Sequence, residues 1–463
     1  MEKPQVKDKP TLTIEEAACL YNIGEHKLRE LTDDDNCNFV LFIGRKRLIK
    51  RKQFDEYMQT FGAVCIEGPK YCGKTWTARS RAKSAAFVGN PENNFQTRTM
   101  AQISPDLVLK GDLPRLIDEW QEVPSLWDAV RFEVDKDSRK GKYILTGSTT
   151  PNHKGIMHSG TARISKVRMN TMSLYETGDS TGEVSLKDLF CDNIENKITG
   201  EVTLERLIYY AVRGGWPGNL ETPEKTCGKL AKEYLKTIVD DDMFSVDGVK
   251  RDSRKVWSLL HSLGRNESTL AGNSTLRKDM GAKDEIEIDR DTISDYLDIF
   301  QRLFILDDQP AYNTNLRSSR RILKSAKRHF TDPSLAVAAL GATPKMLLND
   351  LNMFGFIFES LCEHDLKIYA EYHDAKLFHF RDERGNEADA IVEFPDGTWG
   401  AFEIKLGANQ IDAAAEELLK LKLIMEKEGD TPPKLLCVIC GMSYMAYKRP
   451  DGVYVVPITA LKP

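Results

Sequence analysis

Residues 66–80, IEGPKYCGKTWTARS, combine a flexible backbone with a cation and a hydroxyl at fixed spacing. Gly68 and Gly73 stand five positions apart, and Lys74 and Thr75 follow the second glycine directly. Glycines let a loop curl so that successive N–H groups point inward, where they can bind phosphate oxygens. A lysine at the end of such a loop reaches the β- and γ-phosphates, and the hydroxyl can ligate Mg²⁺. The sequence therefore predicts a site for nucleotide phosphates, formed by Gly68, Pro69, Lys70, Tyr71, Cys72, Gly73, Lys74 and Thr75.

The flanking residues supply the two elements that must position this loop. Residues 63–67, AVCIE, have the apolar pattern of a short buried strand, and residues 75–84 are expected to be helical. The helix would direct the positive end of its dipole at the bound phosphates. The alternative is a chance turn of glycine and lysine, which the complete pattern between a strand and a helix argues against.

Two further strands are expected to end beside the loop. The stretch LPRLIDEWQ (113–121) ends its apolar run in Asp118 and Glu119. The first acid can hold the water shell of Mg²⁺, and the second can orient an attacking water. Many strands end in acidic residues, so this pair indicates a nucleotide site only in combination with the phosphate loop. The stretch YILTGSTT (143–150) ends in hydroxyls, and Ser148 is either a sensor of the γ-phosphate or the cap of a turn.

These motifs and several longer stretches resemble bacterial and archaeal AAA+-like ATP-binding proteins. The resemblance covers roughly residues 55–460 and is carried by FGAVCIEGPKYCGKTWTA, LPRLIDEWQEVPSLWDAVR, YILTGSTTP, HSGTARISKVRMNTMSLYETGDS, RGGWPGN and KRHFTDPSLA. It implies ATP and Mg²⁺ as cofactors, and hydrolysis of the ATP. It also implies an arginine that contacts the γ-phosphate, in the same subunit or in a neighbour. Arg163 is the first match and Arg168 the second, and a purely structural arginine is the alternative for each.

The C-terminal residues place carboxylates on consecutive predicted elements. Glu359 lies in a helical pattern at 355–366, and Asp389 lies in the second strand of a strand–turn–strand pattern at 378–394. Glu403 and Lys405 are two apart in the strand WGAFEIKLG (399–407), so they share one face. Two carboxylates can hold Mg²⁺ against a scissile phosphate, and a lysine can assist the attacking water. The alternative is the outward face of a half-exposed strand.

This arrangement resembles the PD-(D/E)xK nucleases, and the AAA+-like family has members with a similar domain. The resemblance implies a restriction-endonuclease-like α/β fold with Asp389, Glu403 and Lys405 as catalytic residues. Glu359 then matches the additional acid on the first helix, and Gln410 matches a polar residue on the following helix. A shared fold does not establish cleavage.

The first sixty residues predict a second kind of nucleic-acid contact. The stretch LTIEEAACLYNIGEHKLRELT indicates helix, turn and helix, and NFVLFIGRKRLIKRKQFDEYM indicates a strand, a hairpin tip, a second strand and a helix. Six of the nine residues 44–52 are basic. The segment resembles the winged-helix DNA-binding proteins of the transposon excisionase family. It implies groove or phosphate contacts by His26, Lys27, Arg29, Arg45, Lys46 and Arg47. A solvated run of charges is the alternative.

The remaining residues carry no chemical constellation. Residues 200–345 are mainly helical in pattern, with Trp216 as an expected core residue and an expected helix–turn–helix whose second helix contains the apolar series Ile293, Tyr296, Leu297 and Phe300. Its outer face is acidic, with Asp291, Asp295 and Asp298, and these charges would repel DNA. We therefore expect a structural lid or a protein-interaction element there.

Composition sets the outer bounds. A net charge of −5 over 463 residues excludes a polybasic protein, so any DNA binding must be local. No apolar run approaches a membrane span, no signal peptide is evident, and nine scattered cysteines suit the reducing cytoplasm. Cys437 and Cys440 are expected to be buried thiols rather than metal ligands.

The expected fold class is α/β. A winged helix-turn-helix (1–58) precedes a P-loop parallel α/β ATPase core (59–180), a helical or winged-helix region (181–345) and a nuclease-like α/β domain (346–463). The expected partner is DNA rather than a membrane, and assembly of several copies stays open. The alternative function is a mobile-element regulatory protein in which ATP acts as a switch and the nuclease-like domain is inactive.

Overall fold

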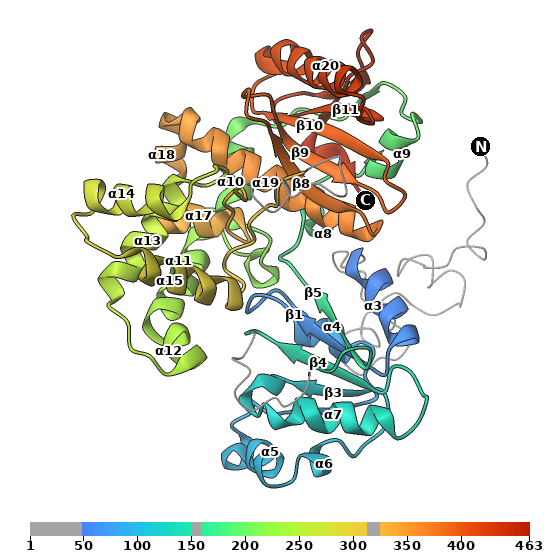
Figure 1. The fold of residues 1–463 in the computed structure, drawn as a ribbon, viewed down its shortest axis with the longest axis vertical. Coiled ribbons are helices and arrows are strands. Elements are labelled where there is room, and N and C mark those ends of the chain that lie inside the picture. Colours follow the sequence, from blue (N-terminus) through green and yellow to red (C-terminus); the bar gives the residue numbers. More distant parts are fainter. Residues whose placement is uncertain (1–48, 150–158, 313–324) are drawn as a thin grey trace, which may run out of the picture. The chain divides into compact units, whose positions relative to one another are not determined.

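Two large sheets organise the chain (Figure 1). The computed structural model describes residues 49–149, 159–312 and 325–463, which belong to one compact unit spanning residues 47–463. The expected winged helix lies almost entirely outside the described residues, as do its predicted DNA contacts His26, Lys27, Arg29, Arg45, Lys46 and Arg47. Only its last element, a helix, is described, as α3 (Ile49–Thr60).

The first sheet consists of five parallel strands in the order β2-β3-β4-β1-β5. The strands are β1 (Ala63–Glu67), β2 (Ser84–Phe87), β3 (Arg115–Asp118), β4 (Tyr143–Gly147) and β5 (Ile164–Arg168). The predicted parallel sheet is therefore confirmed. Because β4 lies between β1 and β3, the loop after β1 and the acids that end β3 meet around the end of β4.

Helices cover both faces of this sheet because its strands alternate apolar side chains between the faces. Ala63 and Cys65 belong to the apolar core on one face, and Val64 and Ile66 to the core on the other. The first core includes residues of α5 (Glu92–Ile103), α6 (Pro105–Val108) and α7 (Ser125–Asp135), and the second includes residues of α3 and α4 (Lys74–Arg79). The helix predicted for residues 75–84 is shorter than expected: α4 ends at Arg79, and Ser84 already begins β2.

Helices dominate the middle of the chain. They are α10 (Leu204–Arg213), α11 (Gly228–Thr237), a π-helix (Ile238–Asp242), α12 (Met243–Asp247), α13 (Ser253–Arg265), α14 (Asn273–Lys283), α15 (Arg290–Arg302), α17 (Pro333–Ala339) and α18 (Pro344–Asn349). Trp216 is fully buried, as predicted. Within α15 the predicted apolar series is also buried, and its acidic residues are exposed.

The second sheet has seven strands in the order β7-β12-β13-β11-β10-β9-β8. They are β7 (Lys197–Ile198), β8 (Lys376–Arg381), β9 (Glu387–Glu393), β10 (Trp399–Lys405), β11 (Leu435–Cys440), β12 (Met445–Lys448) and β13 (Tyr454–Pro457). Phe402 and Ile404 belong to the core that includes α19 (Leu351–Tyr372), whereas Ala401 belongs to the core that includes α20 (Ile411–Glu428). The observed helix α19 and strands β8, β9 and β10 agree with the helical pattern predicted at 355–366 and the strands predicted at 378–394 and 399–407.

The segment after the first sheet reaches the C-terminal residues. It contains α8 (Leu174–Thr177), β6 (Val184–Ser185) and α9 (Leu186–Phe190) before β7. β6 pairs in parallel with β14 (Leu461–Lys462), and β7 pairs with β12.

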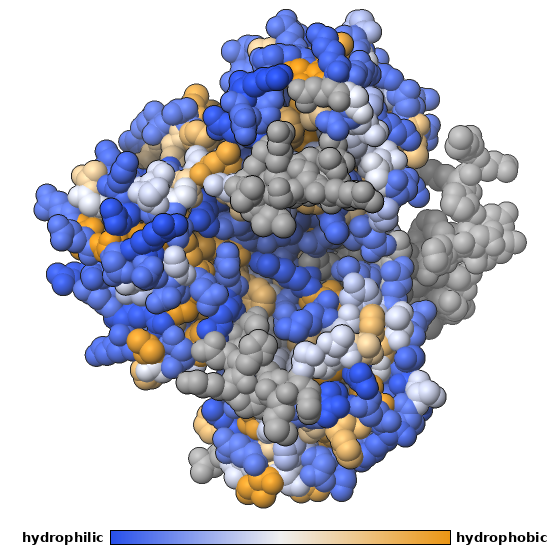
Figure 2. Space-filling model, viewed as in Figure 1, coloured by the Kyte–Doolittle hydropathy of each residue, from blue (hydrophilic) through white to orange (hydrophobic). Residues whose placement is uncertain are grey.

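The drawn surface is mainly polar, and two predicted thiols are buried. On the face drawn in Figure 2, hydrophilic residues prevail and apolar residues lie in scattered patches. Within the described ranges, no helix is both long and apolar enough to cross a membrane. Cys437 and Cys440 are buried free thiols, as predicted.

Candidate functional site

Two glycines determine the shape of the phosphate loop between β1 and α4. A Cβ added to Gly68 would lie 2.1 Å from the carbonyl oxygen of Met169, so no larger residue fits there. Gly73 has a φ of 103°, a backbone conformation that favours glycine. Glycine is therefore required at position 68 by the close approach of Met169, and it is favoured at position 73 by the left-handed backbone.

The lysine and threonine that follow lie as the chemistry requires. The Lys74 ammonium is buried at 4% exposure and donates hydrogen bonds to the carbonyl oxygens of Gly68 (3.0 Å) and Pro69 (2.7 Å). Thr75 donates from Oγ1 to Oδ1 of Asp118 at 2.7 Å. The structure therefore brings the loop and the first acid of β3 together, across 43 residues of sequence.

A buried threonine on β4 connects the two acids. Thr146 is fully buried, and its Oγ1 donates to Asp118 Oδ1 at 2.6 Å. The same hydroxyl accepts a hydrogen bond from the backbone N–H of Glu119 at 3.2 Å. Sequence reasoning did not single out Thr146, although a hydroxyl inside the apolar run YILTG is a recognisable signal. This hydroxyl fixes where the acid pair lies relative to the loop.

The Glu119 carboxylate is held by two side chains. Glu119 has a φ of 55°, and its Oε2 accepts a hydrogen bond from Ser148 Oγ at 3.1 Å. The amide of Gln121 donates to the same oxygen. The structure thus places Ser148 against the predicted catalytic acid, and it adds Gln121, which sequence reasoning missed.

A groove of about 610 Å³, a size typical of small-molecule sites, lies at the phosphate loop. Its lining includes Lys74, Thr75, Glu119 and Ser148. The hydroxyl of Thr75 and the carboxylate of Asp118 are hard oxygen donors, and Mg²⁺ is usually bound by one or two such protein groups together with phosphate oxygens and water. The residues present therefore fit a magnesium–nucleotide complex.

The expectation for Arg163 is wrong for a contact within the same chain. The next residue, Ile164, pairs with Ala63 at the start of β1, whereas the phosphate loop follows the last residue of that strand. One strand length, roughly 15 Å for five residues, separates the two edges. Arg163 instead pairs with Asp135 at the end of α7, with 2.9 Å between Nε and Oδ1.

Arg168, the second match, lies at the same edge of the sheet as the phosphate loop, because it is in strand register with Glu67, the last residue of β1. Its guanidinium contacts Asp307 at 3.3 Å, so it is engaged with the middle of the chain.

The C-terminal carboxylates also converge. Lys405 Nζ lies 2.7 Å from Glu403 Oε2 and 3.4 Å from Asp389 Oδ2. The backbone N–H of Ile404 donates to the same Asp389 oxygen at 2.7 Å. Sequence reasoning thus placed these three side chains together correctly. Gln410 does not join them, because it is exposed and accepts a hydrogen bond from the N–H of Gly407 in its own turn.

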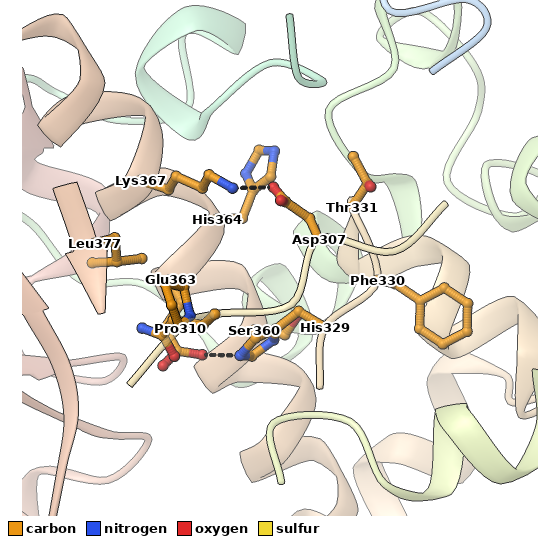
Figure 3. A pocket seen from close by; sticks show the side chains of 11 residues that line it. Asp307, Pro310, His329, Phe330, Thr331, Ser360, Glu363, His364, Lys367 and Leu377 are labelled. Atoms are coloured by element: carbon orange, nitrogen blue, oxygen red, sulfur yellow. Dashed lines mark hydrogen bonds and ion pairs between the residues drawn. The ribbon is translucent and has the colours of Figure 1, made fainter. Parts of the chain in front are cut away.

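A lysine that sequence reasoning missed lies beside Glu359. Lys327 Nζ donates to Glu359 Oε1 (2.7 Å), to Glu363 Oε1 (2.8 Å) and to the carbonyl oxygen of Asp389 (2.9 Å). Glu363 Oε2 also lies 2.9 Å from Nε2 of His329, an ion pair drawn in Figure 3 beside a cavity of about 40 Å³. The stretch KRHFTDPSLA contains both cations, but only the fold shows that they face α19.

Burial makes Glu359 and Glu403 costly to ionise. It raises the pKa of Glu359 to about 8, although Lys327 acts in the opposite direction. Burial and the neighbouring Asp389 raise the pKa of Glu403 well above its usual range. Within the part of the chain that the structure describes, no three acidic, histidine or cysteine side chains are grouped to hold a metal ion. Lys405 lies within 3.4 Å of both predicted metal ligands, Asp389 and Glu403, and its ammonium offsets their negative charge.

Four family models match consecutive parts of the chain. Residues 2–64 match the excisionase from transposon Tn916, and residues 60–178 match an AAA domain, AAA_14. Residues 204–346 and 354–461 match two domains of unknown function, DUF8612 and DUF4143. The ATPase match coincides with the parallel sheet and its phosphate loop.

Individual relatives agree with these matches. An uncharacterized protein of Mycobacterium tuberculosis is 24% identical over 351 residues, covering 74% of this chain and 70% of that protein. The Tn916 excisionase of Streptococcus agalactiae is 46% identical over 55 residues, covering 12% of this chain and 82% of that protein.

Solved structures are more distant. A Walker-type ATPase of Pyrococcus abyssi has a TM-score of 0.39 at 13% identity, covering 64% of this chain and 95% of that one. A structure of Drosophila ORC bound to DNA has a TM-score of 0.23 at 12% identity, covering 68% and 93%. The chain therefore belongs, through its N-terminal residues, to the Tn916 excisionase family, and it carries an AAA-type P-loop ATPase domain.

Proposed function

We propose that this protein is a Mg²⁺-dependent ATPase that acts with DNA. One observation carries the proposal: Lys74 and Thr75 at the start of α4 line one groove with Glu119, and Thr75 donates a hydrogen bond to Asp118 at the end of β3. The AAA domain match supports nucleotide binding at this place.

The side chains of the groove have separable roles in this proposal. Lys74 exchanges its two carbonyl partners for β- and γ-phosphate oxygens, which neutralises charge that develops during phosphoryl transfer. Thr75 and Asp118 would hold Mg²⁺, which supplies further charge neutralisation. Glu119 orients the attacking water, and Ser148 and Gln121 hold its carboxylate in place.

DNA is the proposed partner because residues 2–64 belong to the excisionase family. Replacing Arg45, Lys46 and Arg47 with glutamine should flatten the plot of log affinity against log salt by roughly 3, since each lost phosphate contact contributes about 0.9. Titration of a fluorescent duplex at several salt concentrations measures this slope. A matched variant of three exposed lysines, Lys110, Lys140 and Lys187, should leave the slope unchanged. An unaltered slope in the first variant would exclude this DNA contact.

Phosphodiester cleavage is the second candidate function. The gathering of Asp389, Glu403 and Lys405 at the end of β10 favours it. The alternative is a nuclease-like fold whose charged cluster only supports structure, which the pairing of Lys327 with Glu359 and Glu363 favours. In that case nucleotide occupancy would act as a switch in a DNA-binding protein.

A paired measurement on one preparation separates these functions. Glu119→Gln should reduce phosphate release about a hundredfold and leave ATP affinity nearly unchanged, because the carboxylate acts on water and not on bound phosphate. Nicking of supercoiled plasmid with Mg²⁺ should fall at least tenfold in Asp389→Asn and not in Asp396→Asn, an exposed turn residue. ATP turnover without any nicking by the wild type would leave the ATPase and exclude the nuclease.

A further inference from the structure

The phosphate loop is bound by residues of the helical region. Lys70 Nζ lies 2.6 Å from Asp242 Oδ1, and the backbone N–H of Lys70 donates to the hydroxyl of Tyr234 at 3.2 Å. Tyr234 lies on α11, and Asp242 ends the π-helix that follows it. These contacts span 172 and 164 residues, so they join parts of the chain that no local pattern connects.

Both partners of Lys70 are held firmly. Tyr234 is 6% exposed, and its ring centroid lies 4.9 Å from that of Trp216. Burial raises the pKa of Tyr234, so its hydroxyl stays neutral. Asp242 is also 6% exposed, and its Oδ2 has no hydrogen-bond partner among the described residues. π-helices occur often at functional sites, and this one turns a buried carboxylate toward the loop.

These contacts compete with a bound triphosphate. The inward N–H groups of such a loop are donors for phosphate oxygens, and the N–H of Lys70 is taken by a hydroxyl instead. The Asp242 carboxylate holds the ammonium of Lys70 and also places a negative charge beside the loop, where it repels phosphate. Anything that removes these two contacts should therefore favour the nucleotide-bound loop.

We propose that Asp242 and Tyr234 form a clasp that holds the phosphate loop against nucleotide, and that a nucleoside triphosphate opens the clasp and frees α11 and the π-helix. The inference rests on nucleotide binding in the proposed function and does not require hydrolysis. The coupling is reciprocal: the factor by which the closed clasp weakens nucleotide binding is also the factor by which bound nucleotide disfavours the closed clasp. The helical region would thereby report the nucleotide state of the ATPase sheet.

Substitutions of the two clasp residues test the clasp directly. Asp242→Asn removes the charge and keeps the shape, and Tyr234→Phe removes the hydroxyl and keeps the packing on Trp216. Calorimetry with a non-hydrolysable ATP analogue and Mg²⁺ should show Kd lowered about five- to tenfold by Asp242→Asn and about two- to threefold by Tyr234→Phe. Asp241→Asn is the matched control, because Asp241 is exposed in the same π-helix.

Hydrogen exchange adds a readout that a merely structural role would not move. Amides of residues 228–247 should exchange faster when the analogue is added to the wild type, and should exchange fast from the start in Asp242→Asn. Unchanged or weaker binding in both variants would overturn the clasp while leaving nucleotide binding intact. Failure of the wild type to bind the analogue would instead overturn the proposed function.

Discussion

Replacing Lys74 with alanine is expected to abolish measurable ATP turnover and to weaken ATP affinity at least a hundredfold. The ammonium is buried inside the loop, so no other cation can take its place without rebuilding the loop. Charge-assisted hydrogen bonds to phosphate are among the strongest that a side chain makes. The same ammonium also stabilises the charge of the transition state, and removal of one such donor typically lowers the rate by about 10²–10³.

Calorimetry for affinity and phosphate release for turnover measure this effect. Lys83→Ala is the matched control, because Lys83 is an exposed lysine in the turn before β2. A melting curve without nucleotide shows whether the loss of two internal hydrogen bonds, about 1 kcal/mol each, has disturbed the fold. A folded Lys74→Ala variant that binds ATP as tightly as the wild type would remove the basis of the phosphate site.

Replacing Lys327 with methionine is expected to destabilise the protein by about 3–5 kcal/mol, the usual result of removing one partner from a buried ion pair. The variant keeps the length of the side chain but leaves Glu359, Glu363 and the carbonyl of Asp389 without their shared donor. On the scale of a domain of this size, the calorimetric melting temperature should fall on the order of 10 °C. Lys345→Met, at an exposed position of α18, should change it little.

The free energy of unfolding that the Lys327→Met variant loses should depend on pH. The pKa of Glu359 is raised in the folded protein to about 8, so its contribution favours folding at low pH and is lost as the pH rises toward that value. Without Lys327 the pKa of Glu359 should rise further. The pKa of Glu363, which Lys327 and His329 hold below its usual value against the opposite effect of burial, should rise as well. The deficit of the variant should therefore be larger at pH 8 than at pH 5. An equal deficit at both pH values would show that lost packing, not lost charge, causes the effect.

The sequence by itself determined the features whose chemistry depends on short spacing. The phosphate loop, the acids that end β3 and the Glu403–Lys405 pair were all predicted correctly in place. Each is encoded within a few residues, because a strand or a tight turn fixes the direction of neighbouring side chains. The burial of β1 followed from its continuous apolar run, and the buried face of α15 followed from its helical periodicity.

The tertiary structure decided everything that depends on register and on distant partners. Arg163 directly precedes β5 and Arg168 ends it, and only the pairing of β5 with β1 decides which of them lies at the phosphate-loop edge. Lys327 reaches Glu359 and Glu363 across 32 and 36 residues, and Lys70 reaches Asp242 across 172. Burial and a low dielectric strengthen the attraction between such groups, and both exist only after the chain has packed. No local pattern of residues therefore predicts these pairs.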